Sequence, residues 1–355
     1  MVNARMPPDG RPSVKVGTKQ LLLSVALASA GLLSCSPPAE PATRREKIFT
    51  ATCAISLYDH GGEEAFSAAF AALRETDARL SMWRPDSELA ALNSRAGQGP
   101  QAVSPQLRSV LARGLDLARL SGGRYDPSVG PLVRLWGVGT EREALPPPEA
   151  IAAARALVGW KEVELDPATS MVELTKPGMA LDFGSLAKGE GAVRAGEALA
   201  AAGVRSAVVD VGGSILALGS KPGGKAWRIG IQRPGSARGE MLGYVELRDA
   251  AVNTSGIYER WFEAEGRRWN HIVDTDTGYP LDNGLLSVTV IRPRRESGDG
   301  PSLAILCLGL EKGLALAEEL ELAAILVDAE RGIHLSSGAR GLFTLVDPDY
   351  HLSDS

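Results

Sequence analysis

One stretch of this 355-residue chain has the composition of an anion-binding turn. Residues 171–190 predict a strand that runs into Asp182-Phe183-Gly184-Ser185-Leu186-Ala187-Lys188-Gly189, with a helix starting directly afterwards. Glycine lets the backbone approach a ligand, and a helix N-terminus presents unpaired N–H groups and a partial positive charge to an anion. A capped helix that follows a strand has the same pattern, so this stretch alone does not identify a ligand site.

Four further blocks contain residues that can bind a ligand or react, namely Ser81–Asn93, Gly122–Gly137, Val209–Pro234 and Thr254–Pro280. The last block includes His271, one of only four histidines in the chain. Imidazole titrates near neutral pH, so His271 is a candidate base or phosphate contact. Asp274 is a candidate to orient His271 or to act alone. A structural histidine held in a loop is the alternative.

In this order the blocks resemble the FAD:protein FMN transferase family, the ApbE lipoproteins. The resemblance rests on runs such as Arg124-Tyr125-Asp126-Pro127, Asp210-Val211-Gly212-Gly213 and Thr254-Ser255-Gly256. It implies an α+β, T-fold-related architecture and an enzyme that splits FAD, joins FMN to a threonine hydroxyl of a partner protein and releases AMP. Phosphoryl transfer of this kind needs neutralised charge and an in-line nucleophile.

The resemblance also assigns roles to single residues. The residues expected to contact FAD are Thr50, Trp83, Arg124, Tyr125, Asp126, Asp182 and Lys188. Trp83 stands where relatives usually have a tyrosine against the isoalloxazine ring, and an indole face can form the same stack. The alternatives are a core tryptophan at Trp83, a turn residue before proline at Asp126 and a solvated helix charge at Lys188.

A magnesium site is implied by the same resemblance. Asp299 matches the metal carboxylate of the family, and Ser185 matches a position whose backbone carbonyl completes the site. Both are the hard oxygen ligands that Mg²⁺ prefers. Relatives have a threonine or aspartate at the position of Leu303, where leucine offers no oxygen. Ser302 is a substitute ligand only if the local helix is rotated, so this departure puts catalytic efficiency in doubt more than FAD binding.

The pattern of apolar residues predicts the elements that hold these blocks. Helical spacing recurs over Glu63–Arg79, Ser104–Ser121, Gly184–Ala202 and Pro301–Leu320. Strands are expected at Glu162–Leu174, Ser206–Leu218, Trp227–Gln232 and Leu286–Arg292. Short strands joined by tight turns favour a mixed α+β fold with largely antiparallel sheets flanked by helices over a doubly wound fold.

The first 45 residues differ from the rest of the chain. Lys15 and Lys19 precede the apolar run Leu21–Leu33, which is typical of a secretory signal and is too short to span a bilayer comfortably. Leu32-Leu33-Ser34-Cys35 resembles the lipobox of bacterial lipoproteins. A cleaved signal with an incidental cysteine is the alternative.

We therefore expect three parts. Residues 1–34 are a lipoprotein signal peptide, residues 35–45 a tether and residues 46–355 an FAD-binding transferase domain. Lipidated Cys35 would anchor an exported protein to the bacterial membrane, facing the periplasm or the cell exterior.

Composition narrows the function classes. Hydrophobic residues at 44% and charged residues at 23% indicate a globular protein with a sizeable core. Residues 1–34 are basic, so the whole-chain charge of −5 leaves about −8 on the remainder, which argues against nucleic acid as a partner. Cys53 and Cys307 do not support a disulfide framework.

The expected partners are exported acceptor flavoproteins of redox chains. Two alternatives stay open. One is hydrolysis of FAD to FMN and AMP by the same site, and the other is a non-catalytic FAD-binding carrier.

Overall fold

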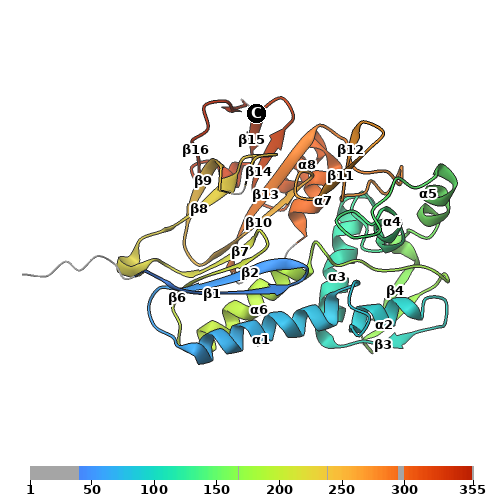
Figure 1. Ribbon diagram of the computed structural model, residues 1–355, viewed down its shortest axis with the longest axis horizontal. Coiled ribbons are helices and arrows are strands. Elements are labelled where there is room, and N and C mark those ends of the chain that lie inside the picture. The colour runs from blue at the N-terminus through green and yellow to red at the C-terminus, as the bar shows by residue number, and fades with distance from the viewer. Residues whose placement is uncertain (1–39, 167, 238, 295–299, 354–355) are drawn as a thin grey trace, which may run out of the picture. The chain divides into compact units, whose positions relative to one another are not determined.

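A central sheet runs through the residues that the computed structural model describes, which are 40–353 apart from 167, 238 and 295–299. Within these residues its nine strands lie in the order β1 (Ala42–Ile48), β2 (Ala51–Leu57), β6 (Ser206–Val211), β7 (Ser214–Gly219), β10 (Ala250–Gly256), β13 (Leu285–Pro293), β14 (Ala323–Asp328), β15 (Gly332–Leu335) and β17 (His351–Leu352) (Figure 1). Neighbouring strands are antiparallel except β15 and β17, which are parallel. The predicted α+β class with largely antiparallel sheet is confirmed.

Smaller sheets and the helices surround this sheet. The smaller sheets are formed by β16 (Phe343–Leu345), β9 (Met241–Leu247) and β8 (Trp227–Gln232), by β3 (Gln101–Ala102), β5 (Met171–Leu174) and β4 (Val163–Asp166), and by β11 (Trp261–Ala264) and β12 (Arg267–Asn270). The α-helices are α1 (Glu63–Leu80), α2 (Glu88–Ser94), α3 (Pro105–Leu120), α4 (Gly130–Trp136), α5 (Pro148–Arg155), α6 (Ala187–Ala201), α7 (Pro301–Leu308) and α8 (Leu310–Glu319).

Helices α1 and α6 lie side by side along β2, β6 and β7 (Figure 1). The buried side chains of α1 include Phe66, Phe70 and Leu73, whose spacing of three and four residues forms the apolar face expected from the sequence. Helix α6 contributes mostly small residues. A Cβ atom on Gly196 would lie 2.1 Å from Leu216 Cδ2, so glycine allows this helix to pack closely on the sheet.

The predicted helix Pro301–Leu320 is two helices in the structure. Gly309 separates α7 from α8, with φ 80° and ψ −179°, a conformation that glycine adopts much more readily than other residues. Both helices pack against β13 and β14 through one apolar cluster.

Two predicted strands are hairpins. Ser206–Leu218 folds as β6 and β7 around Gly212 and Gly213, whose φ values of 58° and 96° suit a two-residue hairpin turn. Glu162–Leu174 folds as β4 and β5. The predicted strand Trp227–Gln232 is β8, and Leu286–Arg292 lies within β13.

Strand β1 begins at Ala42, inside the predicted tether of residues 35–45. Residues 1–34 and Cys35 lie outside the described residues, so the signal peptide and the lipid anchor stay predictions. Among the described helices, none is both long enough and apolar enough to span a bilayer.

Candidate active site

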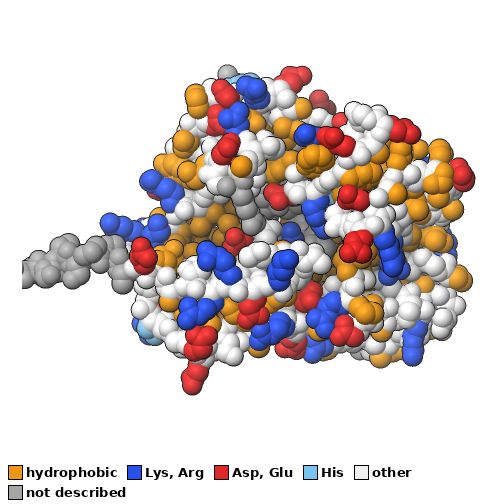
Figure 2. Space-filling view, viewed as in Figure 1, with side chains coloured by type: hydrophobic (Ala, Val, Ile, Leu, Met, Phe, Trp, Pro, Cys, Tyr) orange, Lys and Arg blue, Asp and Glu red, His pale blue; other side chains and the backbone are white. Residues whose placement is uncertain are grey.

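A cavity of about 490 Å³ lies where the ends of several central strands meet the start of α6. All five blocks singled out in the sequence contribute to its lining, and α7 adds Leu303 and Cys307. The volume is within the range of small-molecule and cofactor sites. Acidic and basic side chains are interspersed over the face shown in Figure 2, which is hollowed near its centre.

The turn between β1 and β2 places Phe49 and Thr50 at the cavity. Thr50, expected to contact FAD, lies in this two-residue turn. Both residues have positive φ, 55° and 56°, which is uncommon for residues other than glycine. A Cβ on Gly191 of α6 would lie 2.9 Å from Phe49 Cζ, and one on Gly212 would lie 2.8 Å from Ala51 Cβ. Close packing therefore holds the turn.

Trp83 lines the same part of the cavity and is 42% exposed, so it stands at the mouth and not in the core. Its loop is fixed by Arg84, which contacts Asp77 at 3.4 Å and Asp86 at 2.7 Å. Asp77 also accepts a hydrogen bond from the Phe49 amide, and burial raises the pKa of this carboxyl. Asp77 thus connects the Trp83 loop to the Phe49 turn.

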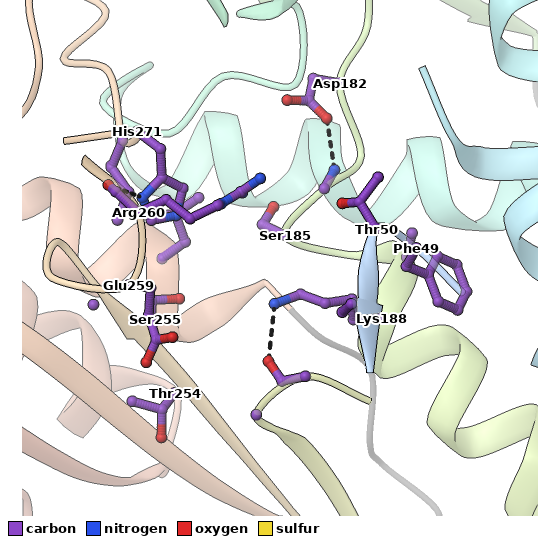
Figure 3. Close-up of a pocket in the computed structure, with 18 of the residues that line it drawn as sticks. Phe49, Thr50, Asp182, Ser185, Lys188, Thr254, Ser255, Glu259, Arg260 and His271 are labelled. Carbon is purple, nitrogen blue, oxygen red and sulfur yellow. Dashed lines mark hydrogen bonds between the residues drawn. The ribbon is translucent and has the colours of Figure 1, made fainter. Parts of the chain in front are cut away.

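The start of α6 presents donors and a cation to the cavity. Within the described part of the chain, the amides of Lys188 and Gly189 and the carbonyl of Ser185 form no protein hydrogen bond. The Lys188 ammonium donates to the Gly212 carbonyl at 3.4 Å and lines the cavity (Figure 3). Lys188 is therefore not simply a solvated helix charge, and the helix start has the unpaired N–H groups of an anion site.

Asp182 and Tyr125 flank this helix start. One carboxylate oxygen of Asp182 accepts the Gly184 N–H at 2.7 Å, and burial raises the pKa of Asp182. The Tyr125 hydroxyl lies 3.2 Å from Ser185 Oγ. Both residues line the cavity, as the sequence predicts for FAD contacts.

Asp126 has a structural role in the same region. One of its oxygens accepts hydrogen bonds from the amide and the hydroxyl of Ser128, both at 2.7 Å, and the other accepts the Trp160 N–H at 2.8 Å. Burial raises its pKa. Asp126 also lines the cavity, while both of its carboxylate oxygens accept hydrogen bonds from the protein's own turn, so its contact with FAD stays a prediction.

His271 lies half-buried at the cavity wall, where its Nδ1 is 3.2 Å from the Arg260 carbonyl oxygen (Figure 3). A carbonyl oxygen only accepts, so the proton is on Nδ1 and Nε2 is left with a lone pair. Burial, followed by the charges of Arg260 and Lys188, lowers the pKa of His271 to about 3. The ring is therefore neutral near pH 7, with Nε2 unprotonated.

Among the described contacts Asp274 has none with His271, so it does not orient that ring, and a role of its own stays a prediction. Its carboxylate instead accepts the amides of Asp276 and Thr277 and lies 3.5 Å from Arg124, which also pairs with Asp276. The Thr275 hydroxyl donates to the Gly123 carbonyl at 2.8 Å. These contacts join two of the sequence blocks. Arg124 lines the cavity, but its charge is shared with this pair of carboxylates.

The predicted metal ligands are only partly brought together. Asp299 lies outside the described residues. Ser302 is buried, and its hydroxyl is 2.9 Å from that of Ser255, while Leu303 and not Ser302 lines the cavity. The helix is therefore not rotated to offer Ser302. Among the described residues, no group of three or more His, Cys, Asp or Glu side chains is arranged to hold a metal.

Two cavity residues were missed by sequence reasoning. Within the block Thr254–Pro280, Glu259 and Arg260 directly follow the run that ends at Tyr258, and both line the cavity. Glu and Arg are common on surfaces, so their types gave no signal. Their position inside a recognised block was the only available indication.

Comparison with known proteins now adds to this geometry. Residues 49–326 match the model of the ApbE family. The chain belongs to the ApbE family. A Treponema pallidum member named FAD:protein FMN transferase is 35% identical over 314 residues, which cover 83% of this chain and 87% of that protein. A Klebsiella pneumoniae member with the same name is 35% identical over 301 residues, covering 84% and 93%.

Solved ApbE structures have the same architecture. The flavin transferase ApbE from Vibrio cholerae matches with a TM-score of 0.76 and 29% identity, covering 86% of this chain and all of that one. The apo flavinyl transferase ApbE from Pseudomonas stutzeri gives 0.73 and 33%, covering 86% and 97%. The predicted ApbE-like architecture is confirmed.

Proposed function

We propose that this ApbE protein is an FAD:protein FMN transferase, which cleaves FAD and joins FMN to a hydroxyl, expected to be that of a threonine, on an acceptor protein. The observation that carries the proposal is the start of α6, where unpaired amides and Lys188 face a cavity with Trp83 at its mouth. Related proteins named FAD:protein FMN transferase support the same activity.

Different residues bind FAD and accept the proton in this proposal. Trp83 stacks on the isoalloxazine ring, and the α6 amides with Lys188 stabilise negative charge on the pyrophosphate. Nε2 of neutral His271 takes the proton of the acceptor hydroxyl as its oxygen bonds to the FMN phosphorus. The bond from that phosphorus to the bridging oxygen breaks, and AMP leaves with the electron pair.

Magnesium fits the described residues only in part. The Ser185 carbonyl oxygen has no protein partner among them, so it is a suitable hard ligand, whereas Leu303 supplies none. Asp299 would supply the carboxylate if the family resemblance holds at that position. The ion, when bound, would neutralise phosphate charge. A site with one protein oxygen fewer should bind it more weakly.

One experiment separates the three functions that this cavity allows. The purified protein is incubated with FAD, magnesium and an acceptor flavoprotein, and flavin is followed on denaturing gels while AMP is measured. Covalent flavin on the acceptor with equimolar AMP supports transfer. AMP without a conjugate identifies a pyrophosphatase, and FAD recovered intact identifies a carrier; either result contradicts the proposal.

Export and lipid anchoring are a second part of the proposal. They rest on Lys15, Lys19, the apolar run after them and Cys35. Cys35→Ala should move the protein from the membrane fraction to the soluble fraction and leave FAD affinity unchanged. A wild-type protein that is already fully soluble would contradict the anchor.

A further inference from the structure

The arginines around the cavity differ in how their charges are used. Arg124 pairs with Asp274 and Asp276, and Arg84 pairs with Asp77 and Asp86. In the part of the chain that the structure describes, the guanidinium of Arg260 forms neither an ion pair nor a hydrogen bond. Toward the described residues, therefore, Arg260 is a cation whose side-chain donors are unused.

The arm of Arg260 is directed across the cavity. Figure 3 shows it extending from the wall that holds His271 toward Ser185, while Lys188 enters from the opposite side. Its Cδ lies beside Gly139, where an added Cβ would be only 3.2 Å away, so the backbone there supports the side chain. The charge already acts on this region, since it lowers the pKa of His271.

We infer that Arg260 is a binding residue for the pyrophosphate of FAD, opposite Lys188. The inference rests on the proposed function and adds a specific ligand group to it. A guanidinium presents a planar set of donors that matches phosphate oxygens, and such charge-assisted hydrogen bonds are about twice as strong as neutral ones. A second cation also suits a site in which Leu303 removes one metal ligand.

The experiment compares FAD with riboflavin, which has the same ring system and no phosphate. Affinities of the full chain are measured by flavin fluorescence in the presence of a chelator, so that FAD is not cleaved. Arg260→Gln should weaken FAD binding by about ten- to a hundredfold, the scale of a lost hydrogen bond to a charged group, and leave riboflavin binding unchanged. Equal loss for both flavins, or unchanged FAD affinity, would overturn the inference.

Two matched variants complete the test. Arg134→Gln removes the same charge from an exposed residue of α4 that acts on Asp182 but does not line the cavity. It should leave FAD affinity unchanged, and a loss equal to that of Arg260→Gln would point to general charge and overturn the assignment. Arg260→Lys should recover part of the FAD affinity; no recovery would contradict a role based on charge. Failure of the proposed function would be seen in a different measurement. The wild-type protein would then not transfer FMN, whatever the FAD affinities of these variants.

Discussion

The two sides of the cavity differ in the chemical groups that line them. The side formed by the β1–β2 turn, the Trp83 loop and the start of α6 contains an aromatic ring, a cation and amides that have no partner among the described residues. The side formed by α7 contributes Leu303 and Cys307, and the hydroxyl of Ser302 in this helix is hydrogen-bonded to that of Ser255. We therefore expect substitutions in α7 to affect metal binding more than flavin binding, whereas the start of α6 would serve both through Lys188 and the Ser185 carbonyl.

The largest effect is expected on the metal side. Asp299→Ala should abolish magnesium-dependent FAD cleavage, since the family resemblance offers no other anionic ligand there. Asp299→Asn, which keeps one oxygen, should retain some cleavage at high magnesium. AMP release is measured against magnesium concentration. Cleavage at the wild-type rate in Asp299→Ala would mean that the metal is held elsewhere.

Next is the proton acceptor on the wall between the two sides. His271→Ala should lower the rate of FMN transfer by roughly 10²- to 10⁴-fold, the usual contribution of a positioned base, with FAD affinity retained. Single-turnover transfer and FAD titration separate these quantities. His60→Ala is a control, because the His60 side chain is 61% exposed and lies outside the cavity lining. A parallel loss of FAD affinity would indicate a phosphate contact instead.

A smaller effect is expected at the aromatic stack. Trp83→Ala should weaken FAD by about 1–3 kcal/mol, the scale of a lost aromatic stack on a base. Trp261→Ala removes a tryptophan of similar exposure, 41% against 42%, that does not line the cavity, and it should leave FAD affinity unchanged. Equal affinities of Trp83→Ala and wild type, measured by flavin fluorescence, would remove Trp83 from the flavin site.

The smallest effect is expected at Leu303 of α7, where this chain departs from the family pattern. Leu303→Thr should raise apparent magnesium affinity by a few-fold, because it adds an oxygen at the cavity wall. Leu303→Val is the matched control, since valine has nearly the shape of threonine and loses the same packing against the two apolar clusters that Leu303 joins. If the valine variant gains as much affinity, the missing oxygen is not the reason for weak binding.

Helices and strands that follow the local spacing of apolar residues could be predicted from the sequence. The helical period over Glu63–Arg79 gave α1 to within one residue, because it records which face is buried. The errors came where glycine interrupts a pattern. Gly309 divides one apolar run into two helices, and Gly212-Gly213 turns one predicted strand back on itself. In both places apolar residues continue on either side of the glycine, so apolar periodicity alone predicts a single element.

The sequence predicted which segments form the site better than it predicted the role of each residue in them. Trp83, Lys188 and His271 reach the cavity as expected. The carboxylates of Asp126 and Asp274 accept hydrogen bonds within turns, which could not be predicted, because an aspartate that binds a ligand and one that holds a turn look the same in sequence. Arg260 differs from the paired arginines only in its neighbours, which the fold alone determines.

The turn at Phe49 and Thr50 also ties the cavity to strand register. Cys53, Ile55 and Leu57 alternate toward the core along β2, and the pairing of Cys53 with Val211 brings this turn beside Gly212. Adding one residue to β2 would turn its apolar side chains outward and shift Thr50 away from α6. Substitutions in the turn can therefore change this wall of the cavity without disturbing the sheet. A change in the length of β2 would disturb both.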